Sequence, residues 1–361
     1  MSTILQSDIW AQLQEANGHQ VFRGKGEGWQ YMATLEGGST GRYLYAPYGP
    51  EADNAAAFDA AIADMKRVAA DNKCWFIRVE PTNDAIWGAQ SGEAFLAARG
   101  FTLSPRQVQP SHTQIIDLTL TEEELLKNIG SSNRNLHRNI HKKGVTFEKS
   151  QDPADIKILL KYLDETAGRA GFNRQQDDYL TRVAQVLMPA DAATLFIAKV
   201  DGEPIGASLI YDSDDTRVYA HTATSYEHRK LKVGNPLLST IILDAKEKGL
   251  TYMDLFGIAP NDDPNHEWAG FTKFKKSFGG TSVAYPGTWD LPVSTAGYKA
   301  YQGIRAGRET LAQGIRAGRE ALAQGIRAGC EALAQGKKFA TGTLLPKAKD
   351  AAGKVRARIG K

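Results

Sequence analysis

Residues Gly270–Gly280 read GFTKFKKSFGG, a short amphipathic segment with glycine at both ends. Its three phenylalanines recur at i, i+3 and i+7, which is the spacing of one helical face, and its three lysines fill the gaps between them. Like charges this close on a helix cost about 0.2–0.5 kcal/mol per pair unless anions lie nearby. The segment therefore predicts either a solvated, lysine-rich helix or a helix that presents cations to an anionic ligand.

The residues before this segment predict a helix followed by a buried strand. Pro236–Lys248 has the 3.6-residue period of a helix, and Tyr252–Gly257 (YMDLFG) is an apolar run with a single acid. A strand followed by an aromatic, lysine-rich turn resembles the C-terminal signature of the FemABX family, the peptidoglycan-bridge aminoacyltransferases. That signature is roughly Asp-Phe-Gly-Gly, then Gly-x-x-x-Phe-Lys-x-x-Phe-Gly, and Asp254–Gly257 and Gly270–Gly279 fit it.

Four further segments extend the resemblance over residues 1–292, in the same order along the chain. They are Tyr45–Pro50 (YAPYGP), Phe76–Pro81 (FIRVEP), Gln109–Leu118 (QPSHTQIIDL) and Arg134–Val145 (RNLHRNIHKKGV). Each motif is weak alone, but five in register are specific. FemABX proteins are described as two tandem domains of the GNAT acyltransferase fold, so the resemblance implies an α/β (α+β) architecture of that kind.

Hydrophobic periodicity repeats a similar plan of strands and helices in both halves of the chain. Residues 1–145 predict strands at 29–35, 41–45, 74–79 and 113–118, and helices at 52–72, at 92–99 and after Thr121. Residues 146–292 predict helices at 152–170 and 176–188, a hairpin of 194–200 and 204–211 turned by Asp201-Gly202, and a strand at 218–224. We therefore expect GNAT-like domain 1 at 1–145 and GNAT-like domain 2 at 146–292.

Composition limits the class of protein. With 361 residues and 42% hydrophobic content, the chain can bury the cores of two ordinary domains. Cys74 and Cys330 stand at no disulfide or metal spacing, which fits a reducing compartment. The first residues lack the pattern of a signal peptide, and no run approaches the roughly 20 apolar residues of a spanning helix. We expect a cytoplasmic protein that can bind peripherally to the inner face of the membrane.

Positive charge is concentrated at the C-terminal end. Residues 301–361 hold 13 Lys and Arg against 4 Asp and Glu, whereas the other 300 residues hold 31 against 37. A mildly acidic body thus carries a strongly basic tail, and such tails usually meet nucleic acid or anionic membrane.

The tail contains an internal repeat, because Gln302–Ala312 recurs at 313–323 and 324–334. A period of 11 residues keeps the Ile and Leu side chains on one helical face, although glycine twice per repeat destabilises a helix by about 1 kcal/mol each. We expect an amphipathic repeat helix at 293–336 and a basic, disordered tail at 337–361. Three roles stay open: a helix packed on the body or self-associated, a helix on the inner leaflet, or a tRNA-gripping arm.

Lys275 is the main candidate catalytic residue. When an amine attacks an ester carbonyl, negative charge develops on the oxygen, and a fixed cation there lowers the barrier. The family's Phe-Lys pair maps onto Phe274 and Lys275. The resemblance implies that this lysine helps to bind the tRNA 3′ end and stabilises the transition state, the alternative being a surface lysine.

A second basic cluster precedes the middle of the chain. Arg134 and Arg138 lie one helical turn apart and could bind the phosphates of a nucleotide-sugar, a lipid pyrophosphate or tRNA, although a solvated basic face fits equally well. His137 and His141 have metal-ligand spacing, but no third ligand accompanies them, so we expect no metal site.

The resemblance also implies residues that bind the peptidoglycan precursor. Arg174, Tyr179 and Tyr219 lie where the family has an arginine and tyrosines lining the precursor cleft, although Arg174 and Tyr179 are five rather than four residues apart. The family's lysine after the first tryptophan has no counterpart here, which argues against a UDP-linked acceptor or shifts the diphosphate contact to Lys25. Glu80 is a candidate ligand or base for the acceptor amine, or simply a strand-end acid.

With the resemblance, these features predict a metal-independent aminoacyltransferase that moves an amino acid from aminoacyl-tRNA to the side-chain amine of a peptidoglycan stem peptide. We expect no cofactor beyond the aminoacyl-tRNA co-substrate. The acceptor would be lipid II or UDP-MurNAc-pentapeptide, and the basic tail favours the lipid-linked form. The alternatives are a CoA-dependent GNAT N-acyltransferase and a non-catalytic membrane- or tRNA-binding protein. His228–Pro236 argues against CoA, because it has one glycine, and a proline where N–H donors would be needed.

Overall fold

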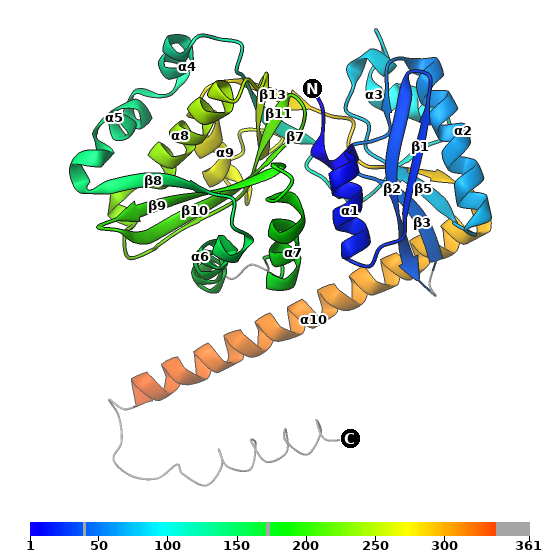
Figure 1. Ribbon diagram of the computed structural model, residues 1–361. Helices are drawn as coiled ribbons and strands as arrows, with labels where there is room; N and C mark the ends of the chain where they lie inside the picture. Colours follow the sequence, from blue (N-terminus) through cyan, green and yellow to red (C-terminus); the bar gives the residue numbers. More distant parts are fainter. Residues whose placement is uncertain (39–40, 171–173, 337–361) are drawn as a thin grey trace. The chain divides into compact units, whose positions relative to one another are not determined.

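The computed structural model describes residues 1–38, 41–170 and 174–336 (Figure 1). The chain divides into a compact unit over Met1–Tyr298 and a second unit from Lys299 onward. The described strands of the first unit form two seven-stranded sheets with helices packed against them. The predicted mixed α/β fold class is therefore confirmed.

The first sheet is mainly antiparallel and has the order β1-β2-β3-β5-β14-β6, with β4 paired to β2. Its strands are β1 (Val21–Gly26), β2 (Trp29–Gly38), β3 (Gly41–Ala46), β4 (Glu51–Ala52), β5 (Phe76–Val79), β6 (Thr102–Leu103) and β14 (Trp289–Pro292). Helices α2 (Ala55–Asp71) and α3 (Gly92–Ala98) bury apolar faces against it, around Phe58, Met65 and Phe95. Asn54 fixes the start of α2, because its side chain accepts a hydrogen bond from the Ala57 N–H.

The second sheet has the order β13-β7-β12-β11-β10-β9-β8. Its strands are β7 (His112–Asp117), β8 (Val145–Ser150), β9 (Ala193–Val200), β10 (Glu203–Asp212), β11 (Thr216–Thr224), β12 (Tyr252–Gly257) and β13 (Thr281–Ala284). Asp201 and Gly202 both have positive φ between β9 and β10, so the predicted hairpin and its turn are confirmed.

Helices cover both faces of the second sheet. One core cluster joins it to α1 (Asp8–Ala16), α6 (Ile156–Ala170) and α7 (Asp177–Leu187). The cluster on its other face includes side chains from α4 (Glu122–Asn128), α8 (Gly234–Glu247) and the aromatic residues in and after α9 (Ala269–Lys276); α5 (Ser131–Asn139) packs beside α8. Burial on both faces explains why β9 and β10 read as nearly continuous apolar runs.

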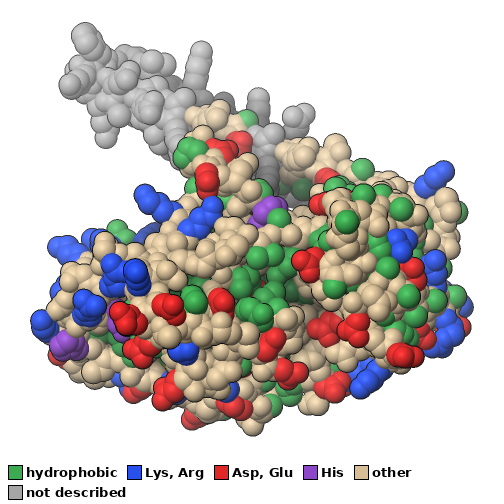
Figure 2. Space-filling model, turned by 90° about the horizontal axis from the view of Figure 1, so that it is seen from above, with side chains coloured by type: hydrophobic (Ala, Val, Ile, Leu, Met, Phe, Trp, Pro, Cys, Tyr) green, Lys and Arg blue, Asp and Glu red, His purple; other side chains and the backbone are tan. Residues whose placement is uncertain are grey.

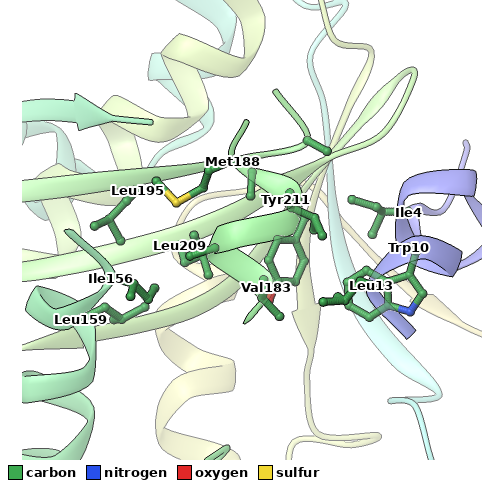
Figure 3. Close-up of a cluster of buried hydrophobic side chains, with 14 of the residues drawn as sticks. Ile4, Trp10, Leu13, Ile156, Leu159, Val183, Met188, Leu195, Leu209 and Tyr211 are labelled. Carbon is green, nitrogen blue, oxygen red and sulfur yellow. The ribbon is translucent and has the colours of Figure 1, made fainter. Parts of the chain in front are cut away.

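Helix α1 was not predicted, yet it ties the N-terminal residues to the second sheet. Its N-cap Ser7 accepts a hydrogen bond from the Trp10 N–H. Figure 3 shows Ile4, Trp10 and Leu13 beside Tyr211 and Val183, and the Trp10 and Tyr211 rings meet edge to face at 5.7 Å. The same core cluster contains Met32 of β2, so side chains of both sheets pack together within one compact unit.

Two strands cross between the halves of the sequence. β7 comes from the first half but pairs with β12 and β13 of the second sheet. β14 lies at the end of the second half but pairs with β5 and β6 of the first sheet. The predicted boundary between residues 145 and 146 thus does not coincide with the division between the sheets, because alternating burial marks a strand without specifying its partner.

The repeat segment forms part of helix α10 (Thr295–Gly336), close to the expected bounds of 293–336. Several of its apolar side chains are exposed, namely Ile304, Leu311, Ile315, Leu322 and Ile326. None of the described helices has the length and apolar content needed to cross a membrane. The tail predicted at 337–361 lies outside the described residues.

Candidate functional site

A cavity opens where β11 and β12 separate. The two strands pair in parallel only between Thr216–Val218 and Tyr252–Asp254, after which β12 continues beside β7. The cavity has a volume of about 180 Å³. Its polar and aromatic lining includes Trp10, Tyr48, Thr82, Gln109, Gln175, Tyr179, Tyr211, His221, Asp254, Phe256 and Tyr285. Figure 2 shows hydrophobic side chains gathered in the middle of one face, with Asp and Glu side chains around them.

A β-bulge determines which β11 side chains reach this cavity. The register between β10 and β11 shifts so that Leu209 pairs with His221 and Ile210 pairs with Tyr219, leaving Ala220 as the extra residue. Ala220 and His221 consequently both line the cavity. Tyr219 belongs instead to the core cluster on the other face of the sheet.

Asp254 supplies a buried carboxylate at the end of β12. Its Oδ1 accepts hydrogen bonds from the Thr113 hydroxyl and from the Phe256 N–H, the latter at 2.6 Å. No described residue hydrogen-bonds the other oxygen, Oδ2, although Asp254 lines the cavity. Burial raises the pKa of this carboxyl, and its hydrogen bonds and the nearby Lys275 oppose that shift.

Phe256 and Lys275 form the next part of the site. Phe256 has φ of 62°, a left-handed conformation that is uncommon for a residue other than glycine. The Lys275 ammonium donates to the carbonyl oxygens of Phe256 at 3.1 Å and Gly257 at 2.7 Å, and lies 5.1 Å from the centre of the Phe271 ring. Burial lowers the pKa of Lys275 to about 8, while Asp254 opposes that shift.

The pattern of α9 explains how Lys275 comes to be held there. Phe274 and Phe278 pack into the core with their ring centres 5.2 Å apart, so they anchor the helix. Lys273 and Lys276 are exposed, and Lys276 pairs with Asp262 at 2.8 Å. Of the three lysines in this segment, only Lys275 turns its ammonium toward the end of β12.

Aromatic side chains wall the cavity on several sides. The Tyr48 and Tyr285 rings meet edge to face at 5.7 Å, and burial raises the pKa of both hydroxyls, with Asp254 adding to the shift. Tyr211 lies 5.9 Å from His221, ring centre to ring centre, and no described residue hydrogen-bonds its buried hydroxyl. Burial lowers the pKa of His221 to about 4, so its imidazole is neutral at pH 7.

The structure brings some predicted substrate-binding residues into this site and not others. Tyr179 lines the cavity, and burial raises its pKa to about 12. Arg174 precedes the cavity residue Gln175, but its guanidinium binds Asp164 at 2.8 Å and Asp177 at 2.5 Å. Tyr219 is in the core, with its hydroxyl hydrogen-bonded to Ser208 and Thr222.

Glu80, Lys25 and the arginine pair do not line the cavity. Glu80 is buried, and its carboxylate accepts hydrogen bonds from Tyr45, Gln109 and Thr288, so it holds the first sheet together rather than facing a ligand. Lys25 is exposed on β1. Arg134 donates to the carbonyl oxygens of Leu126 and Lys127 at the end of α4, and it lines a shallow surface pocket with Arg138.

Most cavity residues were missed as site residues, among them Tyr48, Asp254 and Tyr285. Tyr48 and Asp254 were quoted as parts of motifs, and a buried acid within an apolar strand is a usable signal for a functional carboxylate. Tyr285 follows β13 without any comparable pattern. The described residues contain no group of three or more His, Cys, Asp or Glu side chains placed to hold a metal ion.

Comparison with known proteins identifies relatives over most of the first unit. A family profile described as an Acetyltransferase (GNAT) domain matches residues 126–268. A lipid II:glycine glycyltransferase of Staphylococcus epidermidis is 26% identical over 169 residues, and that match covers 45% of this chain but only 40% of the relative. The protein of the same name from Staphylococcus saprophyticus is 20% identical over 331 residues, with 73% of this chain and 79% of the relative covered.

Solved structures share the fold. FemX aligns with a TM-score of 0.75 at 20% identity, over 82% of this chain and 94% of that chain. L-PGS from Bacillus licheniformis aligns with a TM-score of 0.53 at 15% identity, over 80% of this chain and 88% of that chain. These alignments show that the chain shares its fold with FemX, and the sequence matches show that it is similar to proteins named lipid II:glycine glycyltransferase.

Proposed function

We propose that this relative of the FemABX proteins transfers an amino acid from aminoacyl-tRNA to the side-chain amine of a peptidoglycan precursor, building the interpeptide bridge. The names of its relatives support the acceptor class, because they are called lipid II:glycine glycyltransferases. The donor is proposed as a co-substrate, and the reaction is proposed to need no further cofactor.

The observation that carries this proposal is the placement of Lys275. An ammonium group has three N–H donors, and two of them are occupied by the carbonyl oxygens of Phe256 and Gly257. No described residue accepts a hydrogen bond from the third, which leaves it for a ligand at the end of β12. A cation fixed in this way can stabilise the negative charge that develops on an ester carbonyl oxygen under attack by an amine, without having to reorganise.

A CoA-dependent acyltransferase is the second candidate, since the matching profile describes an acetyltransferase domain. In such enzymes a pyrophosphate would lie on free backbone N–H groups at a helix N-terminus. Here Pro236 stands in the first turn of α8 and has no N–H, and Lys232 before the helix has φ of 51°. This loop therefore supports an ester donor better than CoA.

The acceptor is proposed to be lipid II rather than UDP-MurNAc-pentapeptide, with the protein at the cytoplasmic face of the membrane. Exposed side chains of α10 support this, because Leu311 and Leu322 repeat at the 11-residue period in a region of high positive charge. Flotation with anionic vesicles should recover the full-length protein, and the double variant Leu311→Ser, Leu322→Ser should float poorly. The matched variant Gln313→Ser, Gln324→Ser should behave as wild type; equal flotation of all three would exclude this role for the apolar stripe.

The deciding experiment measures transfer of labelled amino acids from charged total tRNA to lipid-linked and UDP-linked muropeptides. Lys275→Ala should lower the rate roughly 100-fold or more, whereas Lys273→Ala, an exposed lysine on the same helix, should stay near wild type. Label in one muropeptide would also identify the acceptor. Absence of label with intact tRNA and precursor would reject the proposal; acyl transfer from acyl-CoA would then support the second candidate, and binding without any turnover would support a non-catalytic protein.

A further inference from the structure

Resting on the proposed function, we infer that the β11/β12 cavity is a binding subsite for a primary alkylammonium group, and that Asp254 Oδ2 contacts this group and accepts its proton. Among the described residues that line the cavity, Asp254 contributes a carboxylate and no Lys or Arg side chain is present. The cavity is thus electrostatically suited to a cation. Its walls add the faces of aromatic rings, which attract cations.

The two oxygens of Asp254 have different roles. Oδ1 is fixed by the Thr113 hydroxyl and the Phe256 N–H, which sets the direction of the carboxylate. Oδ2 receives no hydrogen bond from a described residue and belongs to a side chain that lines the cavity. This oxygen is therefore free to accept a hydrogen bond from an occupant of the cavity, and a ligand ammonium provides a donor.

The hydroxyl of Tyr211, another group in the cavity lining, also lacks a hydrogen-bond partner among the described residues. Tyr211 is 5% exposed. An unsatisfied buried hydroxyl is unfavourable, so the cavity favours an occupant with polar groups over an empty, apolar packing defect. At about 180 Å³ the space accommodates a side-chain-sized group rather than a whole precursor.

The charged and titratable neighbours are compatible with a cationic ligand. Lys275 keeps its ammonium on the Phe256 and Gly257 carbonyl oxygens, and His221 is neutral at pH 7. The amino group of Met1 pairs with Asp215 at 3.4 Å. The remaining titratable groups that line the cavity, the hydroxyls of Tyr48, Tyr179, Tyr211 and Tyr285, have raised pKa values and stay uncharged.

The proton transfer completes the proposed reaction. The ligand ammonium gives one proton to Asp254 Oδ2 and becomes a neutral amine. Its nitrogen lone pair attacks the ester carbonyl carbon, the new C–N bond forms, and the bond from that carbon to the ribose oxygen breaks. A second proton passes from the nitrogen to the ribose oxygen, one hydrogen stays on the amide, and Asp254 releases its proton to solvent. Burial raises the pKa of Asp254, which makes it a better proton acceptor than an exposed aspartate.

Binding can be tested without turnover, so the result does not depend on the proposed activity. Pentylammonium should bind the full-length wild type more tightly than pentanol, its uncharged counterpart, in an NMR titration. Asp254→Asn retains an oxygen for Thr113 and Phe256, and it should weaken pentylammonium roughly tenfold or more while leaving pentanol unchanged. Asp262→Asn, which removes an exposed carboxylate, should bind both probes as wild type does.

A competition experiment identifies the source of the ammonium group, and a second variant keeps the test decisive if the first variant does not fold. Nα-acetyl-lysine methylamide mimics an acceptor side chain, and 3′-glycylamino-3′-deoxyadenosine mimics the donor amino group. Displacement of pentylammonium by the acceptor mimic would support the proton transfer to Asp254. Displacement by the donor mimic alone would overturn that step, because the donor amino group is not the attacking nucleophile. If Asp254→Asn does not fold, Tyr285→Leu should weaken pentylammonium more than pentanol, because it removes an aromatic wall. Equal binding of the two probes to wild type, or unchanged pentylammonium affinity in a folded Asp254→Asn, would overturn the inference.

Discussion

Asp254 and Lys275 hold Phe256 from its two ends. The Asp254 carboxylate accepts the Phe256 N–H at 2.6 Å, and the Lys275 ammonium donates to the Phe256 carbonyl oxygen at 3.1 Å. Phe256 has φ of 62° between them, a conformation that the surrounding structure must maintain. The two ionisable groups are thus coupled through one backbone segment. Substitution of either should alter the backbone conformation at the end of β12.

Because the ammonium group of Lys275 is buried, we expect the free energy of unfolding to increase as the pH rises above about 8. Its folded-state pKa of about 8 lies below the ordinary value of 10.5, so between these values the unfolded chain binds more protons than the folded one. The free energy of unfolding should therefore increase with pH across that window, on the order of 1–3 kcal/mol. Lys275→Met removes the titrating group and should lose this increase.

Urea unfolding at about pH 7 and about pH 10 measures the effect as a difference between the two proteins. Other lysines and tyrosines titrate in both, so their contributions cancel. Parallel pH dependence of wild type and Lys275→Met would contradict a buried, destabilised ammonium at this position.

The sequence predicts the local elements of the site well, because its patterns are local. Helix α9 and the apolar strand β12 both form as expected, and they place Lys275 against the carbonyl oxygens that end β12. Of the three phenylalanines expected on one buried face, Phe274 and Phe278 pack into the core, whereas Phe271 is exposed. Asp201 and Gly202 likewise predict their hairpin, since a type I′ turn needs positive φ at both residues.

What the sequence could not give is long-range pairing. β7 belongs to the second sheet although it comes early in the chain, and β14 belongs to the first sheet although it comes late. Hydrophobic periodicity identifies a strand but does not specify the strand with which it pairs. Tyr219 illustrates the same limit on a smaller scale. Strict alternation along β11 would place Tyr219 and His221 on one face, but the bulge at Ala220 turns His221 into the cavity and leaves Tyr219 in the core.

That difference makes Tyr179 and Tyr219 a matched pair for testing the proposed precursor site. Tyr179→Ala removes a cavity wall and should raise the KM for the acceptor severalfold. Tyr219→Phe loses hydrogen bonds in the core and should reduce the free energy of unfolding by about 1 kcal/mol while leaving KM unchanged. Steady-state kinetics with urea unfolding separates the two effects, and a raised KM in Tyr219→Phe would place that residue in the site after all.

His221 predicts an acid-sensitive contribution to stability. Its pKa falls from 6.5 to about 4 in the folded state because of burial, so between these values the unfolded chain binds the extra proton. Stability should therefore decrease as pH falls through this window, by roughly 1–3 kcal/mol. His221→Gln should show a shallower loss between about pH 7 and about pH 4.5 in urea unfolding; an equally steep loss would show that the imidazole titrates normally.

Gly270 and Gly280, the first and last residues of the lysine-rich segment, predict opposite responses to the same substitution. Gly280 has φ of 81°, and an added Cβ would lie 2.2 Å from the backbone oxygen of Ile115, where β13 begins to pair with β7. Gly280→Ala should therefore reduce the free energy of unfolding by at least about 2 kcal/mol. Gly270 lies inside α9 with no heavy atom within 4 Å of such a Cβ, so Gly270→Ala should increase stability by up to about 1 kcal/mol.

Thermal and urea unfolding of the two variants, together with transfer assays, tests whether Gly280 positions α9. Because α9 carries Lys275 and Gly280 fixes the chain that leaves it, Gly280→Ala should also lower transfer even where the protein remains folded. Gly270→Ala should leave transfer close to wild type, since it alters neither the anchoring phenylalanines nor the path after the helix. Full activity in a destabilised Gly280→Ala would show that the position of Lys275 depends on the end of β12 alone.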